Sequence, residues 1–245
     1  MVAAVADEPS LRLEGVWTHL PVADGELPED RAYTEVQLDL FDRLVAALAG
    51  AGLHPPVVHV ANTAGAIAFP RSRRVMVRCG IGLYGYVPGP GVARALGEQA
   101  GGETLQPAMS LKARVVAVRE LQAGERPSYG RLRPLPERSV VATVPIGYAD
   151  GVPRALFEAG YEVLIGGKRR PLAGMVTMDQ IVVDCGPDPS VGPGDEVVLL
   201  GTQGSETITA DDWATMLGTI SYEVVCGVGP RMPRVLVNRP DDARA

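Results

Sequence analysis

The hydrophobic period changes near residue 100, and this change limits the folds that the chain can adopt. Before it, short apolar runs alternate with stretches in which apolar side chains recur every three or four residues, which predicts strands joined by helices. After it, the runs have period two and are broken by Gly and Pro, a pattern typical of all-β structure. We therefore predict an α/β domain over residues 1–100 and a β-domain over residues 101–245, with a linker at Gly89–Gly102.

Polar residues follow each of the three strands predicted in the first domain. Parallel α/β sheets and barrels place ligand chemistry at the C-terminal ends of their strands, so we expect these polar residues to share one site. The predicted elements of this domain are strands at Leu11–His19, Val57–Val60 and Val75–Val77 and a helix at about Thr34–Ala49. The strands predicted in the second domain are Leu111–Arg119, Val140–Pro145, Val163–Ile165, Gln180–Asp184 and Glu196–Leu200.

Charge and composition exclude several classes of partner. The formal charge of -6, with acids spread along the chain, argues against nucleic acid, because phosphate binding needs clustered Lys and Arg. The apolar runs fall far short of the roughly 20 residues that span a bilayer, and no secretory leader opens the chain. The three cysteines form neither a CxxC pair nor an even set, and the three histidines lack metal-ligand spacing. We therefore expect a cytoplasmic protein without a metal site.

Four short segments place small residues beside hydrogen-bonding ones, and each has an ordinary structural alternative. Thr63 can bind an anion at a helix N-terminus, or it can simply cap that helix. The glycines of Arg78–Gly85 allow close approach to a phosphate, although a turn glycine is the commoner explanation. Tyr148, in the Gly-flanked loop Pro145–Gly151, is a plausible base only if its pKa falls below about 10; otherwise it is a packing residue. Met175–Asp179 taken alone is a core methionine and a turn aspartate.

Taken together and in this order, these segments resemble the alanine racemases, pyridoxal-phosphate enzymes that interconvert L- and D-alanine for the bacterial wall. The likeness covers nearly the whole chain. The motifs that carry it are Gly15-Val-Trp-Thr-His19, His59-Val-Ala-Asn-Thr63, Arg78-Cys-Gly-Ile-Gly-Leu-Tyr-Gly85, Ser128-Tyr-Gly130, Pro145-Ile-Gly-Tyr-Ala-Asp-Gly151, Gly174-Met-Val-Thr-Met-Asp-Gln180 and Ser221-Tyr-Glu-Val224.

The resemblance implies a partial TIM-type (β/α) barrel that binds pyridoxal 5'-phosphate, followed by a C-terminal β-domain that reaches into the active site of a homodimer partner. It implies that Tyr148 is the catalytic base for one face of the substrate, and that Met178 and Asp179 line the substrate side. Arg78 would face the pyridine nitrogen and His19 would orient Arg78. The remaining cofactor-binding roles fall to Thr63 with the backbone amides of Gly80 and Ile81 at the phosphate, and to His59 and Asn62 beside the ring.

Two departures from the family pattern bear on this chain. The family's cofactor-anchoring lysine lies in a motif like Val-Val-Lys-Ala-Asn-Ala-Tyr-Gly that is absent here, and neither Lys112 nor Lys168 matches it. Pro230 stands where several relatives carry a phosphate-binding tyrosine. With about three of eight βα units represented, we expect an incomplete form of the racemase. The alternatives are a non-catalytic cofactor-binding or dimerisation module, and a racemase for another amino acid such as serine.

Overall fold

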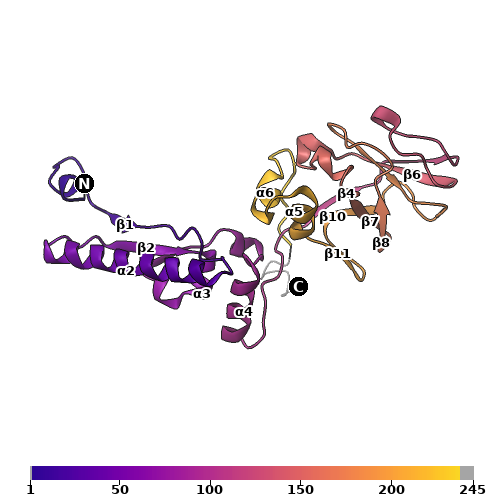
Figure 1. Ribbon diagram of the computed structural model, residues 1–245. Coiled ribbons are helices and arrows are strands. Elements are labelled where there is room, and N and C mark those ends of the chain that lie inside the picture. Colours follow the sequence, from indigo (N-terminus) through magenta and orange to yellow (C-terminus); the bar gives the residue numbers. More distant parts are fainter. Residues whose placement is uncertain (1, 238–245) are drawn as a thin grey trace, which may run out of the picture. The chain divides into compact units, whose positions relative to one another are not determined.

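The computed structural model describes residues 2–237, and the chain divides into two compact units, Met1–Ala108 and Met109–Ala245. Unit 1 combines helices with a parallel sheet, whereas the described part of unit 2 consists mainly of antiparallel strands, with α-helices and short 3-10 turns (Figure 1). The predicted order, an α/β part followed by a β-rich part, is therefore confirmed. Within residues 2–237, none of the helices has the length and apolar character that a membrane crossing requires.

The sheet of unit 1 has three parallel strands in the order β1 (Gly15–Trp17), β2 (Val57–Asn62) and β3 (Met76–Arg78). Trp17 pairs with His59, and Asn62 pairs with Arg78. The C-terminal ends of the strands therefore meet at one edge, as expected. The first strand is much shorter than the predicted Leu11–His19, because its neighbour β2 begins at Val57, which aligns with Gly15.

Helix α2 (Pro28–Gly50) covers this sheet and runs alongside β2 in Figure 1. It begins six residues before the predicted Thr34, because its first turn is polar and carries no apolar periodicity. That turn has Pro28 at the first helical position and Asp30, whose Oδ2 accepts from Leu27 N at 3.2 Å. Its buried apolar side chains, Leu38, Phe41 and Leu48, pack in one core with the sheet residues Val16 and Val60. Each buried Leu or Phe contributes about 1.5–3 kcal/mol.

The predicted linker at Gly89–Gly102 is wrong: the segment forms helix α4 (Pro90–Gln99) within unit 1. Proline is well suited to the first position of a helix, because its fixed φ is helical and its missing N–H is not needed there. Val92 is buried and anchors the helix in the unit 1 core. The other helical elements of unit 1 are α1 (Val2–Ala6), α3 (Thr63–Ala68), η1 (Pro70–Ser72) and η2 (Ile81–Tyr84).

The predicted strand Leu111–Arg119 is also wrong, since it is two strands in different sheets. β4 (Leu111–Arg114) pairs with β10 (Glu196–Gln203), whereas β5 (Ala117–Leu121) pairs with β6 (Ser139–Val144). The chain crosses between the sheets at Val115 and Val116, which donate to Asp195 O and Thr143 O respectively. The remaining strands of unit 2 are β7 (Glu162–Ile165), β8 (Lys168–Pro171), β9 (Ile181–Asp184) and β11 (Glu206–Ile208).

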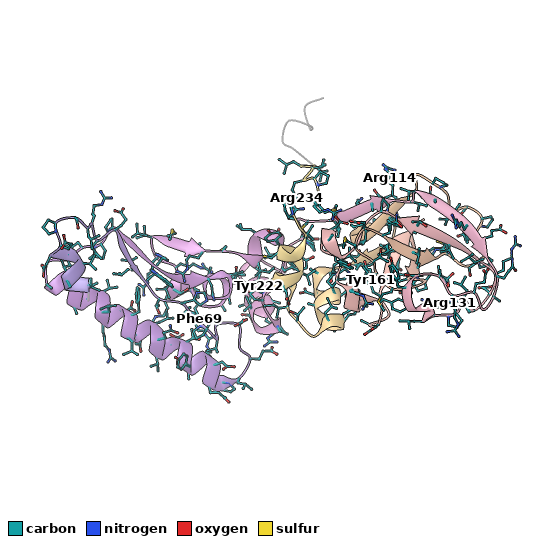
Figure 2. The ribbon with its side chains drawn as sticks, turned by 90° about the horizontal axis from the view of Figure 1, so that it is seen from above. Phe69, Arg114, Arg131, Tyr161, Tyr222 and Arg234 are labelled. Atoms are coloured by element: carbon teal, nitrogen blue, oxygen red, sulfur yellow. The ribbon has the colours of Figure 1, made fainter. Side chains whose placement is uncertain are left out.

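Unit 2 is not purely β, because helices α5 (Ala210–Leu217) and α6 (Ser221–Gly227) close its C-terminal part. Thr209 and Asp212 form a reciprocal cap that starts α5. Trp213 of α5 is fully buried against Tyr161, with ring centroids 5.3 Å apart at 82°. Figure 2 labels Tyr161 within unit 2. The Tyr161 hydroxyl donates to Leu199 O at 2.6 Å, so the helix pair is fixed to the β10 strand.

Candidate active site

Arg78 is the centre of the polar cluster at the C-terminal edge of the unit 1 sheet. Its Nη2 donates to Thr18 O at 2.9 Å and to Val60 O at 3.0 Å, so the ends of β1 and β2 both hold the guanidinium. Its Nη1 lies 2.5 Å from His59 Nδ1, and its Nη2 lies 3.3 Å from His19 Nδ1. The predicted contact with His19 is present, but His59 is the closer imidazole.

His59 and Trp17 complete a stack around this guanidinium. Burial, and then the positive charge of Arg78, lowers the pKa of His59, so the imidazole is neutral at pH 7 and its Nδ1 accepts from Arg78. The Trp17 ring lies 10° from parallel with the His59 ring, with centroids 6.0 Å apart. Its face also lies 5.2 Å from Arg78 Cζ, within the range of a cation–π interaction.

Thr63 joins the next part of the cluster to the loop after β3. The side chain is buried, and its Oγ1 accepts from the backbone N–H of Gly80 at 3.1 Å and of Gly82 at 3.4 Å. A Cβ at Gly82 would lie 2.9 Å from Thr63 Cγ2, so the close approach of this loop requires glycine. The neighbouring Ile81 is buried and begins η2. A hydroxyl and backbone amides thus lie together beside Arg78, the donor types that bind an anion.

Asn62, and not Thr63, is the N-cap of α3. Its Oδ1 accepts from Gly65 N at 2.9 Å, and its Nδ2 donates to Leu20 O at 3.0 Å. The side chain therefore ties the segment after β1 to the start of α3, which fixes the position of Thr63. Thr63 is therefore not the capping residue that the sequence analysis considered, because Asn62 caps the helix.

Tyr148 lies in unit 2, on the turn η4 (Tyr148–Asp150), with 44% of its surface exposed. Its backbone N–H donates to Thr177 O at 3.0 Å, and that of Ala149 donates to Met178 O at 3.0 Å. Met178 and Asp179 are both exposed beside this turn. The structure thus brings Tyr148, Met178 and Asp179 into one neighbourhood of unit 2, and Tyr148 is not buried within its own fold.

A cleft of about 360 Å³ opens beside Tyr148 within unit 2. The residues that line it are Tyr148, Gly151, Pro153, Leu217, Thr219, Glu223, Val224 and Gly227. Neither lysine of the chain is among them. Lys112 Nζ lies 3.1 Å from Glu196 Oε2, and Lys168 Nζ lies 3.5 Å from Asp188 Oδ2. Both ammonium groups are therefore paired with carboxylates of unit 2, Glu196 on β10 and Asp188 in the loop after β9.

Comparison with known proteins identifies the family. A model of the alanine racemase C-terminal domain matches residues 108–236, and a model of the alanine racemase N-terminal domain matches residues 1–88. The chain belongs to the alanine racemase family. The same order of segments that suggested this resemblance therefore spans both domain models. Alanine racemases are pyridoxal-phosphate-dependent isomerases.

Individual alanine racemases match most of this chain but are much longer. The alanine racemase of Symbiobacterium thermophilum is 45% identical over 91% of this chain and 56% of its own length. Alanine racemase 2 of Bacillus subtilis is 42% identical over 97% of this chain and 58% of its own length. The chain thus spans little more than half the length of these relatives.

Solved alanine racemases share the fold. The Bacillus anthracis alanine racemase with bound L-Ala-P has a TM-score of 0.83 and 36% identity, and the match covers 94% of this chain and 56% of that one. The alanine racemase of Streptomyces coelicolor A3(2) has a TM-score of 0.83 and 38% identity, covering 97% of this chain and 60% of that one.

The residues of unit 1 fit the family's cofactor. Pyridoxal phosphate presents a dianionic phosphate and a ring nitrogen, and the edge of the sheet offers a buried hydroxyl, a glycine loop that a Cβ would obstruct, and a fixed guanidinium. The sequence analysis assigned no role to two residues. In unit 1, Trp17 could have been found from its place opposite His59 on the adjacent strand. In unit 2, Arg231, described below, contacts Asp150 and Asp179 and has no local signal.

Proposed function

We propose that this chain forms part of an alanine racemase that interconverts L-alanine and D-alanine with pyridoxal 5'-phosphate by a two-base mechanism. The observation that carries the proposal is the cluster of Arg78, His59 and the Thr63 loop at one edge of a parallel sheet, in a member of this family. Because the chain spans little more than half of its relatives, the activity is proposed for the whole protein to which it contributes.

Arg78 and His59 would control the cofactor ring. Pyridoxal phosphate, when bound, withdraws electrons from the substrate and so acidifies its α-proton. Arg78 would face the ring nitrogen, where a permanent cation opposes protonation of the ring and favours return of the proton to the α-carbon over transamination. The neutral His59 and the carbonyl oxygens of Thr18 and Val60 accept from Arg78 and hold it in place, with His19 as a further partner.

The loop after β3 would hold the phosphate. Thr63 and the amides of Gly80 and Ile81 would donate to phosphate oxygens, with Asn62 fixing the turn that carries Thr63. Thr63 Oγ1 accepts from Gly80 N and Gly82 N, which holds the hydroxyl beside the loop amides that would bind the phosphate. Pro230 offers no hydroxyl to the phosphate, so the loop would contribute a larger share of its contacts.

Tyr148 would exchange the α-proton on one face of the substrate. A phenol with a pKa near 10 needs a nearby cation or cofactor to act as a base at pH 7. We propose that Tyr148, with Met178 and Asp179 on the substrate side, serves the active site of a second copy in a homodimer. In this arrangement unit 1 belongs to a TIM-type barrel, and the protein would act in the cytoplasm and supply D-alanine for peptidoglycan.

The second base is the missing component. The two-base scheme needs a lysine on the opposite face of the substrate, and neither Lys112 nor Lys168 matches the family's position. The scheme therefore requires a lysine outside these 245 residues. The lack of such a lysine also favours a second candidate, a non-catalytic cofactor-binding or dimerisation module that retains the arginine cluster and the Tyr148 loop.

The experiment measures D-alanine formed from L-alanine by the protein in the longest form that its gene encodes, with L-serine as a competing substrate. We expect turnover of alanine that falls by about 10²- to 10⁴-fold in a Tyr148→Phe variant, the range typical of losing a general base. Undiminished turnover in that variant would remove Tyr148 from the mechanism. Cofactor binding without any turnover would instead support the non-catalytic module.

A further inference from the structure

The loop that carries Tyr148 lies in direct backbone contact with the Thr177–Asp179 turn. A Cβ at Gly147 would lie 2.2 Å from Thr177 O and 2.4 Å from Met178 O, so the two backbones are closer here than any side chain permits. The N–H groups of Tyr148 and Ala149 donate across this contact to Thr177 O and Met178 O. The position of Tyr148 therefore depends on how firmly the loop is held on the turn.

Asp150 holds the loop in shape from inside. Its side chain is only 3% exposed, and its Oδ2 accepts from Gly147 N at 2.9 Å, which closes the turn around Tyr148. A buried carboxylate is stable only when hydrogen bonds and a cation compensate its lost hydration. That cation is Arg231, whose Nε lies 3.3 Å from Asp150 Oδ1.

Arg231 reaches the turn as well as the loop. Its Nη2 donates to Asp179 Oδ1 at 2.8 Å, so a single guanidinium connects the carboxylates of the loop and of the turn. The hydrogen bond to Asp179, and then the charge of Asp150, raises the pKa of Arg231. The segment that carries Arg231 is itself attached to the loop, because Gly229 N donates to Asp150 O at 3.3 Å.

We propose that Arg231 is a positioning residue for racemisation, which fixes the Tyr148 phenol by joining the buried Asp150 to Asp179. The inference rests on the proposed role of Tyr148 as a base. An exposed arginine–carboxylate pair alone contributes little, but here one carboxylate is buried and closes the turn that presents the phenol. The same bridge neutralises Asp179 on the substrate side, where an unpaired carboxylate would repel the carboxylate of an amino acid.

The test compares Arg231→Met with Arg231→Lys in the longest form of the protein, with pyridoxal phosphate bound. Arg138→Met is the matched control, because it breaks an ion pair with Glu120 elsewhere on unit 2 in which both partners are exposed. We expect Arg231→Met to lower kcat by about 10- to 100-fold, the effect of misplacing a reacting group by roughly 1 Å, with KM nearly unchanged. Arg231→Lys should recover part of the lost kcat, and Arg138→Met should leave kcat unchanged.

Amide hydrogen exchange supplies a readout that does not need turnover. Exchange at the N–H groups of Tyr148 and Ala149 should accelerate in Arg231→Met but not in Arg138→Met, because only the first loosens the loop from the turn. Asp179→Asn breaks the bridge to the turn but keeps the cation beside Asp150, so it replaces Arg231→Met in both measurements if that variant does not fold. Normal exchange and normal kcat in both Arg231→Met and Asp179→Asn would overturn the proposal. Accelerated exchange in a protein without racemase activity would overturn the proposed function, but it would still show that Arg231 holds the Tyr148 loop on the Thr177–Asp179 turn.

Discussion

Replacing Gly147 with alanine tests how much the placement of Tyr148 depends on backbone contact. The added Cβ would meet Thr177 O at 2.2 Å and Met178 O at 2.4 Å. Both atoms belong to the backbone, so no side chain can rotate away. The loop and the turn must separate by about 1 Å to bring the shorter contact near 3.2 Å, at the tight limit of real Cβ contacts.

The expected magnitude follows from that separation. Overpacking of this kind costs about 1–3 kcal/mol, and weakening the two hydrogen bonds from Tyr148 N and Ala149 N adds about 1 kcal/mol each. A displacement of roughly 1 Å at a reacting group lowers the rate about 100-fold. We therefore expect Gly147→Ala to lose about 3–5 kcal/mol of unfolding free energy and about two orders of magnitude in kcat.

Urea unfolding followed by circular dichroism measures the first quantity, and D-alanine production per bound cofactor measures the second. Gly192→Ala is the control, because a Cβ there meets nothing within 4 Å and Gly192 is not among the positive-φ glycines. Gly147→Ala behaving like Gly192→Ala in both assays would refute the reasoning, because the loop would then tolerate displacement from the turn without consequence.

Two further predictions concern unit 1. Replacing Arg78 with methionine removes one of the two causes that lower the pKa of His59, so this pKa should rise toward its ordinary value of 6.5, as measured by NMR titration of the imidazole. A lowered histidine pKa makes the folded protein less stable as pH falls below 6.5, because the unfolded state then binds the proton more readily. This loss of unfolding free energy should be smaller in Arg78→Met than in the parent protein. The same dependence of unfolding free energy on pH in both proteins would contradict the prediction. Thr63→Val should cost about 1–3 kcal/mol by leaving the Gly80 and Gly82 amides without their buried acceptor, and should weaken pyridoxal-phosphate binding measured by titration, whereas Thr63→Ser should retain both. Equal affinity in Thr63→Val and Thr63→Ser would remove the hydroxyl from the phosphate site.

The sequence predicted some strands and connections better than others. Apolar runs located β2 and β3 to within about two residues, although in β3 the apolar residues Met76 and Val77 are exposed rather than buried. The glycines and prolines of Gly89–Gly102 indicated a linker, yet Pro90 is a favourable helix start and Val92 fastens the helix to the core. The signal for α5 was present in Thr209 and Asp212, a capping pair that precedes an apolar stretch.

Strand β8 could not have been predicted in this way. Its residues Lys168–Pro171 are mostly charged, and they form a strand because β7 supplies hydrogen-bonding partners in register. Tertiary pairing therefore decides its structure, and local propensity does not.

The candidate site shows the same limit. Motif order made Thr63, Arg78 and Tyr148 candidates, because Thr63 follows β2, Arg78 ends β3 and Tyr148 lies in the turn after β6. The contact between Arg231 and Asp179 joins residues 52 positions apart, and it connects a C-terminal segment to a turn that no local pattern relates. Likewise, the choice of His59 over His19 as the closer partner of Arg78 depends on distances of 2.5 and 3.3 Å that only folding sets.

The Trp17 indole, whose ring face lies against Arg78, can report on the neighbourhood of Arg78 through its fluorescence. The chain has two tryptophans, and Trp213 is fully buried in unit 2 beside Tyr161, whereas Trp17 is 62% exposed at the edge of the unit 1 sheet. With Trp213 replaced by phenylalanine, all tryptophan emission would come from the neighbourhood of the guanidinium. A pyridoxal chromophore absorbs where indole emits, so occupancy of the site would be readable as quenched fluorescence, independent of any covalent attachment.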